Sequence, residues 1–167
     1  MKFQKYMVVG ILGLTMALGF SGCQSENQKN QDAYRKIGIN SMAEGDYDKA
    51  VKSFQKALDT SLGKIGAEEI DICYYKAAAQ FAKKDYDGAI ETYTSLIDYD
   101  KENANAYYLR GSVYLDTDKK DKAFKDYKNA VKYAGREYEI YEGIYENLTN
   151  KGCLLYTSPS PRDAHES

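Results

Sequence analysis

Histidine, proline and tryptophan are nearly missing from this sequence. The 167 residues contain one His, two Pro and no Trp, and the His and both Pro lie within 153–167. Residues 1–152 therefore hold no imidazole that could act as the base of a nucleophile triad. Zinc sites of the Cys/His type also lack their ligands there. The sequence offers no catalytic or metal-binding candidate, so we expect neither an enzyme nor a cofactor.

A dominant charge of one sign is also lacking. The chain has 23 basic and 25 acidic residues, which are interspersed and leave a formal net charge of −2. Because no basic patch stands out, nucleic acid is not an expected partner. No glycine-rich phosphate-binding loop is present, and no small-molecule substrate is expected. With 43% hydrophobic residues, the composition is typical of a folded domain rather than a disordered chain.

Cysteine is scarce, and its three positions have different interpretations. Cys73 falls among apolar residues at helical spacing, so we interpret it as a small buried side chain rather than a nucleophile. Cys153 lies in a C-terminal stretch that differs from the rest of the chain, and Cys23 directly follows the N-terminal stretch 1–22. No intramolecular disulfide is expected.

The N-terminal residues 1–22 have the order of a secretory signal peptide. Lys2 and Lys5 precede an uncharged, mainly apolar stretch over 6–20, and small residues follow. This stretch is shorter than the roughly 20 residues that a membrane-spanning helix needs. The sequence Phe-Ser-Gly-Cys at 20–23 resembles the lipobox of bacterial lipoproteins, which implies a lipid on Cys23. An ordinary signal peptide with an incidental cysteine is the alternative. Residues 23–30 are expected to form a polar tether.

The body of the chain repeats itself. EGDYDKAVKSFQKAL at 44–58 recurs as KKDYDGAIETYTSLI at 83–97, and more loosely as DKKDKAFKDYKNAV at 118–131. A stretch with helical periodicity precedes each copy. Each unit is therefore predicted to be a helix, a tight turn and a second helix. About five extra residues near 60–69 separate the first two units.

These repeats resemble tetratricopeptide repeats, a family of paired helices that stack into a solenoid. The resemblance implies an all-α fold with three full repeats, over about 31–64, 70–103 and 104–137. Residues 138–152 would form the first helix of a fourth repeat, with Tyr141, Ile144 and Leu148 partly exposed. Small and aromatic residues at equivalent places are expected to pack the helices together: Gly38, Ala50, Phe54, Ala77, Ala89, Tyr93, Gly111, Ala123 and Tyr127.

The resemblance also implies a partner site. In the family, the first helix of each repeat lines a concave groove that binds a protein or peptide. The matching residues here are Arg35, Ile39, Met42, Tyr74, Ala78, Phe81, Asn105, Tyr108 and Ser112. Ordinary packing against the next repeat, or beneath a missing C-terminal helix, is the alternative for each of them.

Some members of the family clamp a C-terminal carboxylate with Lys, Asn and Arg side chains. The matching places here are Arg35, Ile39, Tyr75, Asn105 and Leu109. Since only Arg35 and Asn105 have suitable side chains, no such clamp is expected.

The final stretch 153–167, CLLYTSPSPRDAHES, shares neither periodicity nor composition with the repeats. Residues 153–163 resemble the translation of a sequencing-library adapter. We therefore expect a non-native tail on a chain that is a fragment, and Cys153 and His165 are not site candidates. A genuine polar tail is the alternative.

Together these features predict a bacterial lipoprotein of the cell envelope. It would be exported, held by a lipid on the extracytoplasmic side of the membrane, at the cell surface or in the periplasm, and act as a protein-protein interaction scaffold. The alternative is the N-terminal module of a longer envelope enzyme or sensor whose catalytic domain this chain lacks. A spacer without partners is a third hypothesis.

Overall fold

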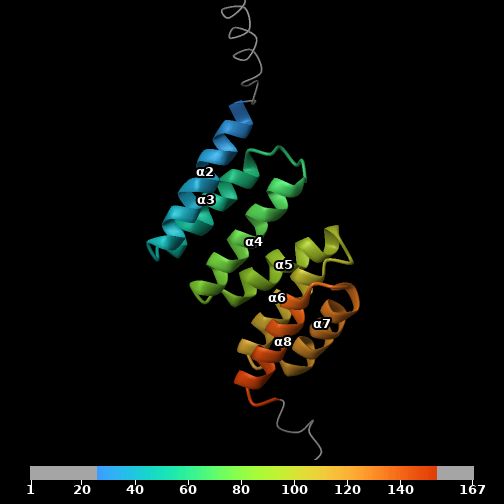
Figure 1. The fold of residues 1–167 in the computed structure, drawn as a ribbon. Coiled ribbons are helices and arrows are strands. Elements are labelled where there is room, and N and C mark those ends of the chain that lie inside the picture. Colours follow the sequence, from blue (N-terminus) through green and yellow to red (C-terminus); the bar gives the residue numbers. More distant parts are fainter. Residues whose placement is uncertain (1–25, 154–167) are drawn as a thin grey trace, which may run out of the picture.

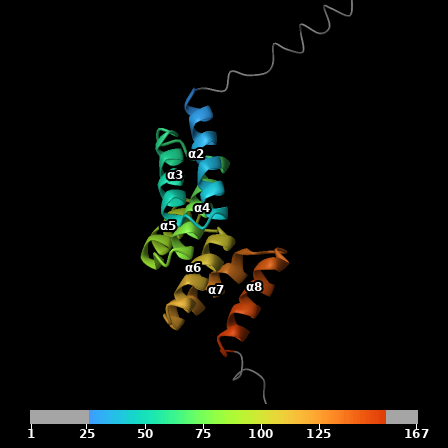
Figure 2. The ribbon, with the colours of Figure 1, turned by 90° about the vertical axis from the view of Figure 1, so that its left-hand side faces the viewer.

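The computed structural model describes residues 26–153, which form consecutive helices stacked in antiparallel pairs (Figure 1). The expected signal peptide, Cys23 and most of the expected non-native tail lie outside the described residues. The helices are α2 (Glu26–Ala43), α3 (Tyr47–Asp59), α4 (Ala67–Ala82), α5 (Tyr86–Tyr99), α6 (Ala104–Asp116), α7 (Lys120–Tyr133) and α8 (Tyr138–Asn150). Viewed from the side, the pairs step along one axis, so the part of the chain shown in colour is an all-α solenoid (Figure 2).

Tight turns join the two helices of each pair, and they share one backbone feature. Gly45, Lys84 and Asp118 all have positive φ, at 77°, 67° and 58°, and they occupy the same place in successive repeats. Gly152, at the end of α8, repeats this with a φ of 67°. A left-handed residue reverses the chain directly after a helix. The predicted helix-turn-helix unit is thus present three times, and α8 ends as the first helix of each pair does.

Short polar side chains cap the N-termini of several helices. Asp46 and Asp85 accept hydrogen bonds from the backbone N–H of Lys49 and Gly88, at the starts of α3 and α5. Asn103 does the same for Ala106 in α6. Such caps satisfy N–H groups that lack a partner within the helix. These local signals set the points where the helices begin.

The interior consists of three apolar clusters, one for each pair of helices. All nine residues that were expected to pack the repeats are buried, and Ala50, Phe54, Ala57 and Ile72 have no exposed surface. A Cβ added to Gly38 would lie 2.5 Å from Cε1 of Phe54, and one on Gly111 would lie 2.8 Å from the Tyr127 ring. The glycines therefore allow an aromatic ring of the second helix to contact the backbone of the first.

Two expectations about the ends of the solenoid need correction. The polar tether was predicted over 23–30, but α2 already begins at Glu26. Ile144 was expected to be partly exposed, but it is 8% exposed and packs into the cluster around Leu115 and Tyr127. Tyr141 is 37% exposed and Leu148 is half-buried, so both are partly exposed as expected. Within residues 26–153, no helix is both long enough and apolar enough to cross a membrane.

Candidate functional site

A hollow lined by several of the expected groove residues lies between α4 and α6. Its volume is about 380 Å³, and it is lined by Asp71, Tyr74, Tyr75, Ala78, Tyr93, Asn105 and Leu109. Of the predicted groove residues, Tyr74, Ala78 and Asn105 meet here. The first helices of two successive repeats supply most of the lining, because residues four apart on a helix share one face. We call this hollow the α4–α6 groove.

Tyr74 is held rigidly at the centre of the α4–α6 groove. Its hydroxyl donates a hydrogen bond to Oδ1 of Asn103 at 2.7 Å, and its ring is tilted against Tyr93 with centroids 6.3 Å apart. Burial raises the pKa of Tyr74, although hydrogen bonds with Asn103 and Asn105 oppose the shift. A fixed aromatic side chain loses little conformational entropy when a partner binds.

Arg35 stands at the other edge of this groove, on α2. Its Nε donates to Oδ2 of Asp71 at 2.9 Å, and Nη2 contacts the same oxygen. The guanidinium carbon lies 5.3 Å from the centroid of the Tyr75 ring. The hydrogen bond with Asp71 is the main reason that the pKa of Arg35 is raised. Because Asp71 already neutralises it, Arg35 is poorly placed to bind a terminal carboxylate.

Three predicted groove residues pack mainly within the protein. Ile39 and Met42 are half-buried against the apolar cluster around Phe54. Phe81 meets Tyr86 edge to face, with ring centroids 5.7 Å apart. These three apolar side chains therefore contact the second helix of their own repeat, and their apolar character does not by itself indicate a groove surface.

Tyr108 and Ser112 were also predicted to line the groove, but α8 packs against both. A Cβ on Gly143 of α8 would lie 2.6 Å from Cζ of Tyr108. The amide of Asn147 donates to Oγ of Ser112 at 2.8 Å and to the hydroxyl of Tyr127 at 3.2 Å. Tyr108 and Ser112 therefore pack against the next repeat, which was the alternative to a groove position. The first helix of that repeat, α8, lies over them.

Sequence reasoning left Tyr75 and Leu109 out of the groove set. Both line the α4–α6 groove, directly after Tyr74 and Tyr108 in the chain. By sequence both match carboxylate-clamp positions, and neither side chain carries a charge. Their apolar character at matching places of successive repeats was the signal that could have identified them.

The described residues offer little for chemistry. Between Glu26 and Cys153, no group of three or more His, Cys, Asp or Glu residues is arranged to hold a metal ion. Cys73 is half-buried beside Ile70 and Tyr74, and burial raises the pKa of its thiol. A thiol with a raised pKa stays protonated and is a poor nucleophile. Cys73 does not line the α4–α6 groove.

Antiparallel helix pairs with left-handed turns and glycine-ring contacts define this protein as an α-helical repeat solenoid. Models of the tetratricopeptide repeat match residues 35–94 and 104–136, and a model described as TPR repeat matches 77–118. The chain belongs to the tetratricopeptide repeat family.

Known proteins resemble the chain over part of their length. Hsp70-Hsp90 organizing protein 2 of Arabidopsis thaliana is 35% identical over 78 residues, covering 46% of this chain and 14% of that protein. The Hsp70-Hsp90 organizing protein of Triticum aestivum is 33% identical over 78 residues, covering 46% of this chain and 13% of that protein. The chain thus spans only a small part of these relatives.

Solved structures share the fold. The Sgt2 TPR domain from Aspergillus fumigatus superimposes with a TM-score of 0.61 and 18% identity, covering 82% of this chain and 89% of that one. The first TPR of Spaghetti (RPAP3), bound to an HSP90 peptide, gives 0.59 and 19%, with 77% and 98% covered. MamA gives 0.58 and 23%, with 74% and 70% covered. At this level of identity the likeness concerns the fold alone.

Proposed function

We propose that this protein is an interaction scaffold that binds an extended peptide segment of another protein in the α4–α6 groove. The observation that carries the proposal is the combination of Tyr74, Tyr75 and Leu109 with a polar rim at Asn105 and Asp71. Aromatic side chains held in place beside hydrogen-bonding groups are typical of binding hot spots. One structural neighbour in the family was solved with a peptide of HSP90, which is a precedent for this kind of partner.

We expect the peptide to be recognised by its side chains rather than by its C-terminal carboxylate. Of the five clamp positions, Ile39, Tyr75 and Leu109 are uncharged and Arg35 is paired with Asp71. A large apolar side chain of the peptide would lie on Tyr74 and Tyr75, and Asn105 would hydrogen-bond its backbone. Blocking the carboxylate of such a peptide is expected to leave its affinity unchanged.

Peptide selection against the full chain tests this proposal. Peptides selected from a random library would be measured by calorimetry against the unmodified chain and two variants. Tyr74→Ala should weaken binding about tenfold or more, as for hot-spot residues. Tyr145→Ala removes an equally large side chain that is 65% exposed on α8, and it should leave affinity unchanged. Equal losses of affinity in both variants would refute the α4–α6 groove as the site. Selected peptides whose affinity does not depend on Tyr74 would refute it as well.

We further propose that the scaffold works outside the cytoplasmic membrane, held there by a lipid on Cys23. This part rests on the order of charges, apolar residues and small residues before Cys23 in the sequence. Cys23→Ala should abolish incorporation of labelled fatty acid and move the chain from the membrane fraction to the soluble fraction. Cys73→Ala is the matched control and should change neither. Labelling that survives Cys23→Ala would overturn the anchoring proposal.

A further inference from the structure

The connection between α3 and α4, residues 60–66, is longer than the other connections between repeats, 100–103 and 134–137. Its backbone enters the left-handed region at Leu62 and Gly63, with φ of 54° and 77°. Leu62 is an unusual residue there, because its branched side chain disfavours positive φ. The start of the loop is fixed by the hydroxyls of Thr60 and Ser61, which donate to the carbonyls of Ala57 and Leu58. We call residues 60–66 the α3–α4 loop.

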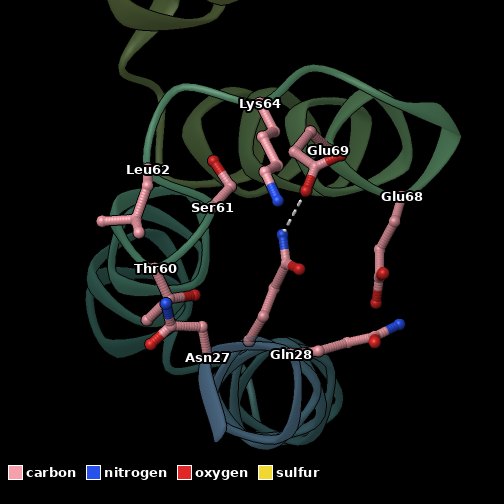
Figure 3. A pocket seen from close by; sticks show the side chains of 9 residues that line it. Asn27, Gln28, Thr60, Ser61, Leu62, Lys64, Glu68 and Glu69 are labelled. Carbon is pink, nitrogen blue, oxygen red and sulfur yellow. Dashed lines mark hydrogen bonds between the residues drawn. The ribbon is translucent and has the colours of Figure 1, made fainter. Parts of the chain in front are cut away.

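The tip of this loop is apolar and exposed. Leu62 is 75% exposed and Ile65 is 57% exposed. Lys64 is the one charged residue of the loop, and it points back into the hollow towards Glu69 (Figure 3). Leu62 lies at the rim of the same hollow (Figure 3). Ile65 lines a different hollow, which it shares with Ile70 and Tyr99. Large apolar side chains exposed in one short loop indicate contact with a protein or a membrane.

The α3–α4 loop lies beside the first turns of α2. Asn27, Gln28 and Gln31 share with loop residues a hollow of about 220 Å³. Across it, the amide of Gln31 donates to Oε1 of Glu69 at 2.7 Å (Figure 3). The second oxygen of Glu69 accepts the backbone N–H of Gly66 at 2.8 Å, which fixes the end of the loop. The loop and the start of α2 therefore belong to one end of the solenoid (Figure 1).

The chain enters this end of the solenoid three residues after Cys23. α2 begins at Glu26, only three residues of sequence after Cys23, and three extended residues span at most about 11 Å. A lipid on Cys23 would hold the start of α2 at the membrane with no room for a long tether. The same restraint would bring the apolar tip of the α3–α4 loop to the lipid surface.

We propose that Leu62 and Ile65 insert into the outer surface of the membrane, so that the loop is a second contact beside the lipid on Cys23. This inference rests on the proposed anchoring. Two apolar side chains add buried apolar area to a lipid anchor and orient the domain that carries it. The positive charge of Lys64 is opposed by Glu68 and Glu69 beside it, so insertion should be apolar in origin. The contact should therefore persist on zwitterionic lipid at high salt.

Tryptophan fluorescence tests the insertion directly, because the chain contains no Trp. Leu62→Trp and, as a matched control, Tyr145→Trp on exposed α8 would each be made in the full chain. The lipidated proteins would be reconstituted into phosphatidylcholine vesicles with and without brominated acyl chains. Brominated lipid should quench Leu62→Trp by about half and leave Tyr145→Trp unquenched, since only the first reaches the acyl chains. Equal fluorescence of Leu62→Trp in both vesicles would overturn the proposal.

A second experiment tests the loop contact independently of a lipid on Cys23. The same two variants would carry a histidine tag before residue 24 and be held on nickel-chelating lipid. Quenching of Leu62→Trp in this form supports the loop contact even if Cys23 carries no lipid in cells. Absence of quenching in both forms refutes it whatever the state of Cys23. If Leu62→Trp is instead shielded only when a second protein is added, the loop is a protein contact and the proposal is wrong.

A substitution at the loop tip provides an independent readout. Asn tolerates positive φ better than Leu does, so Leu62→Asn should not destabilise the fold. Combined with Ile65→Asn, it should increase the release of the tag-held chain from vesicles severalfold after the nickel is chelated. Val131→Asn removes an exposed apolar residue that is 43% exposed on α7, and it should leave release unchanged. Equal release of the two variants would count against insertion.

Discussion

The aromatic ring of Phe54 in α3 lies directly on the backbone of Gly38 in α2, where a Cβ would be 2.5 Å from Cε1 of the ring. Phe54 is fully buried and also stacks on Tyr75 of the next repeat, with ring centroids 5.7 Å apart. One ring therefore joins three helices across two repeats. The absence of a side chain at residue 38 makes this packing possible.

Gly38→Ala is expected to destabilise the protein by roughly 1–3 kcal/mol, because the new methyl group overlaps a buried ring that cannot move away. Urea unfolding followed by circular dichroism measures the change. The same substitution in a Phe54→Leu background should be neutral or stabilising, because Ala favours a helix once the overlap is relieved. A loss of the same size in both backgrounds would show that the ring is not the cause.

The buried ion pair between Arg110 and Asp126 makes a second prediction. Nε and Nη2 of Arg110 donate to the two Asp126 oxygens at 2.7 and 2.9 Å, and Nη1 donates to Thr94 at 2.9 Å. The two side chains are only 15% and 4% exposed. Asp126→Ala leaves Arg110 unpaired, which should cost about 3 kcal/mol or more. The double variant Arg110→Met with Asp126→Leu should recover most of this loss in urea unfolding, and failure to recover would contradict the explanation.

The contributions of two neighbouring glutamates, Glu68 and Glu69, to folding stability should change with pH in opposite directions. A hydrogen bond with Asp32, together with burial, raises the pKa of Glu68 above 4.5. Burial also opposes ionisation of Glu69, but hydrogen bonds from Gln31 and from backbone N–H groups outweigh it and lower its pKa below 4.5. Glu68 therefore contributes stability at acid pH that is lost as pH rises through its pKa. Glu69 contributes stability at neutral pH that is lost as pH falls through its pKa.

Glu68→Gln is accordingly expected to raise stability at neutral pH, and Glu69→Gln to lower it. Both effects should shrink when the pH is well below the usual pKa of glutamate, where the wild-type carboxyls are protonated. Urea midpoints measured at the two pH values test this. The two substitutions serve as controls for each other, and shifts of the same sign at neutral pH would contradict the assigned pKa directions.

Contact between α8 and Tyr108 gives a fourth prediction. Gly143→Val should separate α8 from Tyr108 and speed amide hydrogen exchange in α8, while exchange in α2 to α5 stays unchanged. Tyr108→Phe removes the hydroxyl nearest to residue 143, so it should reduce the effect. Unchanged exchange in α8 would mean that Tyr108 is available to a partner instead.

Sequence by itself determined the repeating unit of this protein. Gly38, Gly111 and the alanines at matching places indicated close helix pairs, and tight turns followed from the segments around Gly45, Lys84 and Asp118. These signals are local, because helix periodicity and residue size act over a few neighbouring residues. The family and the all-α fold could be predicted for that reason.

Only the tertiary structure decided which predicted groove residues are accessible. Tyr74 and Tyr108 occupy the same place in successive repeats, yet one lines the α4–α6 groove and the other lies against Gly143 of α8. The pairing of Arg35 with Asp71 and the position of the α3–α4 loop beside the start of α2 also depend on how repeats stack. Such contacts join residues far apart in the chain, and the periodicity of a single repeat does not contain them.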